Sequence, residues 1–283
     1  MRRLANFASN NRIVVDVLGL IIASIVVHSV YMFWIDPSAI QLLFEAKELG
    51  EPPPRALAVI LKDPEQEICI ILSLWCLWLW VLRYQIFMDE AYLLKDDFLG
   101  LQDVTSFNAT TLHELRQQVA AHLQAEPHLR LLSPVEAALN TLEAHGPATQ
   151  FKEAGDLGTA SCDMHLEQLD AKLNLNKYIL WAIPSLGFLG TVRGIGEALV
   201  RADEALAGDI TGVASSLGVA FNSTFCALFL SLILMAVSYV FQGREEKLVG
   251  DFKQFIATDL IGKLSQLSRA RDSTALPPPS YES

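Results

Sequence analysis

Long apolar segments alternate with polar stretches along this chain, and four of them are long enough to cross a bilayer. A membrane-spanning helix needs roughly 20 apolar residues, because about 30 Å of hydrocarbon is crossed at about 1.5 Å per residue. The segments of this length are residues 13–35, 68–87, 178–200 and 213–241. The pattern therefore predicts an all-α integral membrane protein with four transmembrane helices.

The longest polar stretch, residues 88–177, predicts a helical cytoplasmic domain between the second and third spans. Its apolar positions recur at helical spacing, as in Leu112, Leu115 and Val119. Prolines divide it into several helices. Nothing between Met164 and Ile183 breaks a helix, so the last helix of this domain, residues 159–176, is expected to run directly into the third span.

The remaining stretches complete the expected order of domains. They are residues 1–12 as a cytoplasmic N-terminus, 36–67 as an outer loop, 201–212 as a short outer loop, 242–269 as a cytoplasmic helical extension and 270–283 as a tail. The tail is expected to be disordered because it is polar and rich in proline.

Positive charges flank the two ends of the membrane region. Arg2, Arg3 and Arg12 precede the first span, and Arg244 and Lys247 follow the last. Because cytoplasmic flanks carry an excess of lysine and arginine, both termini are predicted to be cytoplasmic. The first apolar run is too long for a signal peptide and lacks a small-residue cleavage site, so we expect it to remain as a helix.

Composition argues against several classes of function. The net charge of −11 disfavours nucleic acid as a partner, because phosphate contacts need clustered lysine and arginine. Cys69, Cys76, Cys162 and Cys226 lack the spacing of a zinc site and are expected to be small buried residues. No pairing of nucleophile and base stands out, so neither an enzyme nor a cofactor or metal site is predicted.

The third and fourth spans each carry small residues on one helical face. The face of the third span comprises Pro184, Gly187, Thr191, Gly194 and Ala198, and that of the fourth comprises Ser216, Ala220, Ser223, Ala227 and Ser231, with Thr224 at its edge. Gly190 and Gly194 add a pair of small residues four positions apart. Such faces let helix backbones approach closely in lipid, either with each other or around another helix.

The order of these residues resembles the MotA/TolQ/ExbB proton channel family. Residues 184–192 read PSLGFLGTV, and Thr224 follows in the next small-residue span. The resemblance implies an ion pathway lined by Thr191, Thr224, Pro184 and Ser223, with a packing or pore face of Gly187, Gly190, Gly194, Ala220 and Ala227. Taken without the resemblance, the threonines fit ordinary packing helices, with each hydroxyl bonded to the carbonyl four residues back.

The same resemblance implies an assembly in the bacterial inner membrane. Five copies would surround two copies of a single-span partner of the MotB, TolR or ExbD kind, whose membrane aspartate carries a proton or sodium. None of the four spans has a carboxylate at its centre, since Asp16 and Glu197 lie near span ends. A relay for ions needs such a group, so another chain is expected to supply it.

The match to the family is divergent. Relatives of the ExbB and TolQ kind usually carry a glutamate where this chain has Val219, whereas the four-span plan is closer to MotA. Arg193 has Glu197 one turn further on, which predicts a local pair. Arg193 would then either take part in ion entry or extend its charged end to the outer membrane interface. His28 in the first span is expected to be a bonded packing residue.

The sequence thus favours a stator-type subunit of an ion-driven rotary motor, working as a homopentamer. The alternative is a non-conducting membrane scaffold, which would keep the packing faces without needing either hydroxyl. A small-solute transporter would be expected to show inverted repeats, and none is visible.

Overall fold

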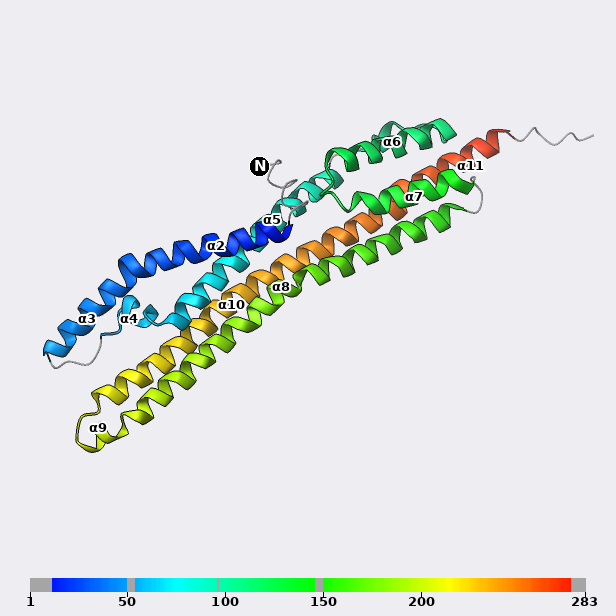
Figure 1. Cartoon of the computed structure of the whole chain (residues 1–283). Coiled ribbons are helices and arrows are strands. Elements are labelled where there is room, and N and C mark those ends of the chain that lie inside the picture. Colours follow the sequence, from blue (N-terminus) through cyan, green and yellow to red (C-terminus); the bar gives the residue numbers. More distant parts are fainter. Residues whose placement is uncertain (1–11, 50–53, 96, 146–149, 276–283) are drawn as a thin grey trace, which may run out of the picture. The chain divides into compact units, whose positions relative to one another are not determined.

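The computed structural model describes residues 12–49, 54–95, 97–145 and 150–275 (Figure 1). Within these residues all regular structure is helical, and no strand is present. The chain divides into two compact units, and we describe each by itself. Of the described residues, the span unit comprises those within 12–81 and 173–240, and the core unit comprises those within 82–172 and 241–275.

Four helices are long and apolar enough to cross a membrane, and each contains one of the predicted spans. They are Ile13–Leu49, Pro64–Leu94, Phe151–Val200 and Thr211–Arg271. Large apolar side chains are exposed along them, for example Ile25, Phe33 and Phe221. An apolar surface of this extent is typical of a protein that faces lipid or other subunits. The prediction of an all-α membrane protein with four spans is confirmed.

The span unit begins with a helix that is longer than the first predicted span. Helix α2 (Arg12–Val30) continues through a π-helical turn (Tyr31–Ile35) into α3 (Asp36–Leu49). Residue 35, expected as the end of the span, is therefore not a helix end. Pro37 lies two residues after the π-helical turn, inside this continuous helix, where proline lacks the N–H of one backbone hydrogen bond.

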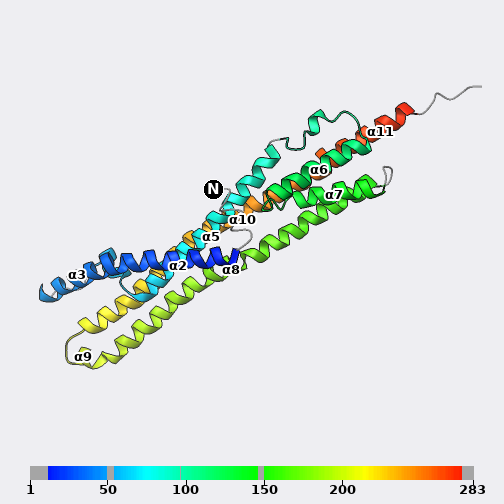
Figure 2. The same ribbon diagram turned by 45° about the horizontal axis from the view of Figure 1, so that its top comes forward.

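The other helices of the span unit are short connections or parts of long helices. They are α4 (Leu57–Leu61), the first part of α5 (Pro64–Lys95), the last part of α8 (Gln150–Val200), α9 (Ala202–Leu206) and the first part of α10 (Thr211–Gln254). Helix α8 is continuous through Thr159 and Pro184, as predicted. Within this unit α8 and α10 lie side by side (Figures 1 and 2).

The core unit holds the largest hydrophobic core. Its own elements are a 3₁₀ turn (Leu101–Asp103), α6 (Ala109–Ala125), α7 (Leu132–His145), a π-helix (Phe255–Gly262) and α11 (Lys263–Ala275). Phe252, Ile256 and Leu260 are fully buried in this core, which also contains residues of α6 and α7. The predicted stripe of Leu112, Leu115 and Val119 faces this core.

The C-terminal part of the chain is helical further than expected. Helix α11 runs to Ala275, so residues 270–275 are not part of a disordered tail. Residues 276–283 and the arginines Arg2 and Arg3 lie outside the described residues, as does most of the expected N-terminal segment.

Candidate functional site

The two small-residue faces predicted from the sequence pack on each other. A Cβ atom on Gly194 would lie 2.7 Å from the backbone nitrogen of Ala220, and one on Gly187 would lie 2.4 Å from the Cβ of Ala227. A Cβ on Gly190 would meet Ser223 Oγ at 2.4 Å. Only glycine fits at these distances, so α8 and α10 are in backbone contact. We call this contact the glycine seam.

Thr191 and Thr224 meet at the glycine seam. Their hydroxyl groups contact each other, and Thr224 Oγ1 donates across to the Gly187 carbonyl at 3.0 Å. Thr191 Oγ1 lies 3.1 Å from the Ala220 carbonyl and 3.3 Å from the Gly187 carbonyl. Both side chains are half-buried, whereas Ala220 is fully buried. The hydroxyl pair therefore lies at the edge of the seam.

The hydrogen-bond capacity of the pair is only partly used within the chain. A hydroxyl has one proton to donate and two lone pairs to accept with. The two protons can be directed to the carbonyls and to the neighbouring hydroxyl, which leaves most lone pairs of Thr191 and Thr224 available. These oxygens can accept a hydrogen bond from a protonated acid or coordinate a small cation. Neither hydroxyl titrates, so the pair cannot carry a proton by itself.

Ser223 and Pro184 occupy different surroundings from the threonines. Ser223 is buried in the seam and bonds the Ala220 carbonyl at 3.0 Å and the Gly187 carbonyl at 3.4 Å. Pro184 stands inside α8 and is half-buried. Because proline lacks an N–H, the carbonyl of Leu180 loses its usual helical donor.

Arg193 forms more contacts than the sequence predicted. The expected pair with Glu197 is present, with Arg193 Nη1 3.2 Å from Glu197 Oε1. The main partner is Glu65, whose two oxygens lie 2.7 and 2.8 Å from Arg193 Nε and Nη2. Asp63 Oδ1 is 3.6 Å from Arg193 Nη2. One guanidinium group thus faces three carboxylates, and we call these four residues the charge cluster.

Sequence reasoning missed Glu65 and Asp63 because both fell in the stretch expected to be an outer loop. A signal was available. Arginine in an apolar span needs a nearby carboxylate as its counter-charge. Glu197 is a single carboxylate near the end of the span, so a further acidic partner for Arg193 could have been sought. Asp63-Pro64-Glu65 is also typical of a helix start, where proline takes the first turn and acids are favoured.

Two other residues that the sequence singled out, His28 and Val219, have different surroundings. His28 Nδ1 is 2.9 Å from Glu67 Oε1, so His28 is bonded as expected, but its side chain is 63% exposed and does not pack inside the chain. Val219, where relatives carry a glutamate, is buried. The four cysteines are free and buried, as predicted.

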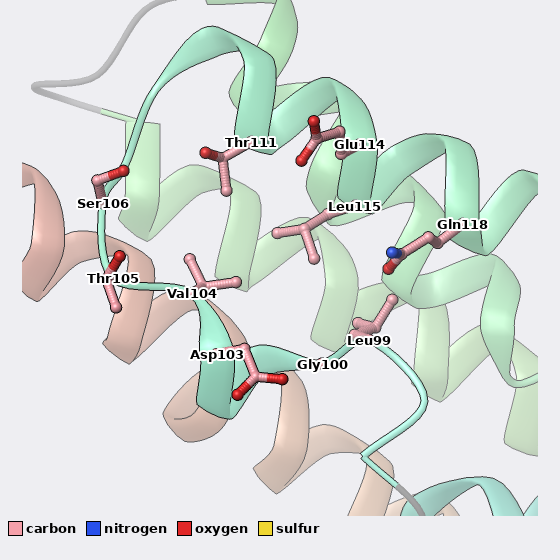
Figure 3. A pocket seen from close by; sticks show the side chains of 10 residues that line it. All are labelled: Leu99, Gly100, Asp103, Val104, Thr105, Ser106, Thr111, Glu114, Leu115 and Gln118. Atoms are coloured by element: carbon pink, nitrogen blue, oxygen red, sulfur yellow. The ribbon is translucent and has the colours of Figure 1, made fainter.

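A pocket of about 360 Å³ lies in the core unit, between α6 and the segment that precedes it (Figure 3). Asp103, Thr105 and Ser106 line it from the segment, and Thr111 and Glu114 line it from α6. None of the residues predicted to form the ion pathway belongs to it.

Part of the chain matches a known protein family. The model of the MotA/TolQ/ExbB proton channel family matches residues 135–254, which contain both faces of the glycine seam and both threonines. No curated protein and no solved structure matches the chain. Together with the four apolar helices, the match makes this a multi-pass membrane protein. On these findings residues 135–254 of the chain match the MotA/TolQ/ExbB proton channel family.

Proposed function

We propose that this protein is the ion-conducting subunit of an ion-driven motor complex. Five copies form a ring around two copies of a single-span partner that carries a membrane aspartate. The observation that carries the proposal is the hydroxyl pair of Thr191 and Thr224, which lies half-buried at the edge of the glycine seam. The family match supports it, because the matched residues include this pair.

The partner is needed because none of the four predicted spans has a carboxylate at its centre. An ionised carboxylate is costly in hydrocarbon, so it is tolerated only where polar groups or water surround it. Thr191 and Thr224 would supply oxygen atoms to the partner's aspartate as it binds or releases a proton or sodium. The change in its charge would move the partner helix past one subunit and drive rotation of the ring.

The orientation in the membrane follows from charge. Arginine and lysine flank the membrane region at both ends of the chain, which favours cytoplasmic termini in the bacterial inner membrane. In this orientation the core unit is cytoplasmic, and the charge cluster lies at the outer end of the third span. The core unit then forms the rim that grips a rotor or anchors the ring.

Replacing Thr191 or Thr224 with valine is expected to lower partner-dependent ion flux about tenfold, because a hydrogen bond to a charged group contributes about 1.5 kcal/mol. Valine keeps the branched shape, so the seam and the assembly should survive. Flux is measured in proteoliposomes that contain the chain and its partner. Thr191→Ser, which keeps the hydroxyl, is expected to conduct.

Ser185→Ala is the matched control. Ser185 is in the same span, and among the described residues its hydroxyl bonds only the carbonyl four residues back, that of Trp181, at 2.8 Å. This variant should conduct like the native protein. Unchanged flux in both valine variants, with intact assembly, would favour a non-conducting scaffold instead.

A further inference from the structure

We infer that Asp63, with Glu65 and Arg193, forms the site at which the transported monovalent cation docks before it reaches the threonine pair. The cation is a proton or sodium, and both are served by the same carboxylate oxygens. This inference rests on the proposed function and names a step of it. Asp63 and Glu65 lie outside residues 135–254, the part of the chain that matches the family model.

Charge is the first argument for a cation at this place. Arg193 contacts the carboxylates of Asp63, Glu65 and Glu197, and Lys62 Nζ adds a second positive charge 3.1 Å from Asp63 Oδ1. Two cationic side chains therefore face three carboxylates. One monovalent cation would neutralise the remaining negative charge. This matters because an unbalanced charge at a membrane segment is costly.

The second argument is an unsatisfied atom. Asp63 Oδ2 is buried and has no hydrogen-bond partner among the residues that the structure describes. The Asp63 side chain is only 7% exposed, and its other oxygen already faces Lys62 and Arg193. A buried carboxylate oxygen without a partner costs free energy. A proton on Oδ2, or sodium beside it, would satisfy this oxygen.

The third argument is position. The Cγ atom of Glu65 lies 3.3 Å from where a Cβ on Gly190 would be, so this side chain abuts the glycine seam. Thr191 is the next residue along α8. The charge cluster and the hydroxyl pair are therefore neighbours on the same helix contact, and a cation docked at Asp63 is next to the pathway.

The two acids have different parts in this step. Glu65 is held by both oxygens in a bidentate pair with Arg193, which fixes its position. Asp63 makes only longer contacts and keeps one oxygen free of partners in the described part of the chain. Asp63 is therefore the group that exchanges the cation, and Glu65 and Arg193 are positioning residues.

A helix start alone does not account for this arrangement. Acids are favoured at the first turn of a helix by the helix dipole, which explains the residue types at the start of α5. This preference does not explain why Glu65 pairs with Arg193 of α8, which is 128 positions further along the chain. It also does not explain why Asp63 Oδ2 is buried without a partner among the described residues.

Asp63→Asn tests the inference in the complete complex. Asparagine has the same shape and caps a helix as well as aspartate, so the start of α5 should be retained. Flux is measured while the outer pH is varied at fixed sodium, and then while outer sodium is varied at fixed pH. We expect the half-saturating concentration of the transported cation to rise about tenfold, because the cation loses one charge-assisted contact. Maximal flux should be unchanged.

Two further variants separate charge from fold. Asp63→Ser, which also caps a helix, is expected to give the same shift as Asp63→Asn. Asp203→Asn removes an exposed carboxylate of α9 and should change neither half-saturation nor maximal flux. An unchanged half-saturation in both Asp63 variants would overturn the inference.

Infrared difference spectra of the purified chain in nanodiscs provide a test that does not depend on flux. Lowering the pH, or adding sodium, is expected to produce a carboxyl signal in the native chain that Asp63→Asn lacks. If the signal and the half-saturation both persist in Asp63→Asn while the native complex conducts, the inference fails and the proposed function stands. If the signal is lost but the native complex does not conduct, the cation site stands and the proposed function fails.

Discussion

Replacing Arg83 with alanine is expected to lower the free energy of unfolding by about 3 to 5 kcal/mol, because it leaves a buried carboxylate without its main partner. Arg83 pairs with Glu245 inside the core unit, and the two side chains are only 11% and 8% exposed. Its Nη2 also lies 3.4 Å from the Leu169 carbonyl, and its guanidinium lies 6.0 Å from the ring centre of Phe241. Denaturant unfolding of the detergent-solubilised protein, followed by circular dichroism, measures the change.

Arg116→Ala is the control for this prediction, since it breaks a pair in the same unit that solvent can reach. Arg116 and Glu143 are 43% and 34% exposed, and exposed pairs contribute at most about 1 kcal/mol. His113 and Arg116, which both bond Glu143, hold the pKa of this carboxyl below its usual value.

The double variant Arg83→Met with Glu245→Leu should recover much of the stability that Arg83→Ala loses, because apolar residues can replace a buried pair. A loss below about 1 kcal/mol in Arg83→Ala would show that the buried pair does not hold the core unit together.

Gly194→Ala is expected to separate α8 from α10 and to destabilise the span unit by about 1 to 3 kcal/mol, the usual cost of overpacking. The added methyl group would lie 2.7 Å from both the Ala220 nitrogen and the Ser216 carbonyl oxygen. Both are backbone atoms, so no side chain can turn away and α10 itself must shift. The shift would also part the hydroxyls of Thr191 and Thr224, and ion flux should fall together with stability.

Gly196→Ala is the matched control, two residues further along the same helix. A Cβ there meets nothing within 4 Å in the described chain, so alanine should be tolerated. Alanine favours a helix over glycine by up to about 1 kcal/mol, so a small gain in stability is expected. Equal losses in the two variants would mean that the glycine seam is not the contact that holds α8 to α10.

The architecture could be predicted because the bilayer sets the length of its helices. Each of the four apolar segments lies inside one long helix, and the apolar stripe of Leu112, Leu115 and Val119 is buried in the core unit. The small-residue faces were visible at helical spacing, yet periodicity cannot tell which partner a face meets. The structure shows that Gly187 and Gly194 meet the residues of α10.

The contacts that escaped prediction are those between residues far apart in the chain. Arg193 was paired with Glu197, which is one turn away, while Glu65 is 128 positions away and was assigned to a loop. The apolar pattern also did not show that the first helix continues past residue 35, where a π-helical turn, Tyr31–Ile35, leads into α3. Local pattern shows where a helix can form, whereas cross-helix pairing depends on the packed arrangement.

A structure of the assembled complex, solved with its partner in lipid, tests the central claim most directly. We expect an acidic side chain of a partner helix within hydrogen-bond reach, about 3 Å, of the Thr191 or Thr224 hydroxyl in at least one subunit of the ring. A ring whose centre holds only lipid, or whose Thr191 and Thr224 hydroxyls face acyl chains, would contradict it.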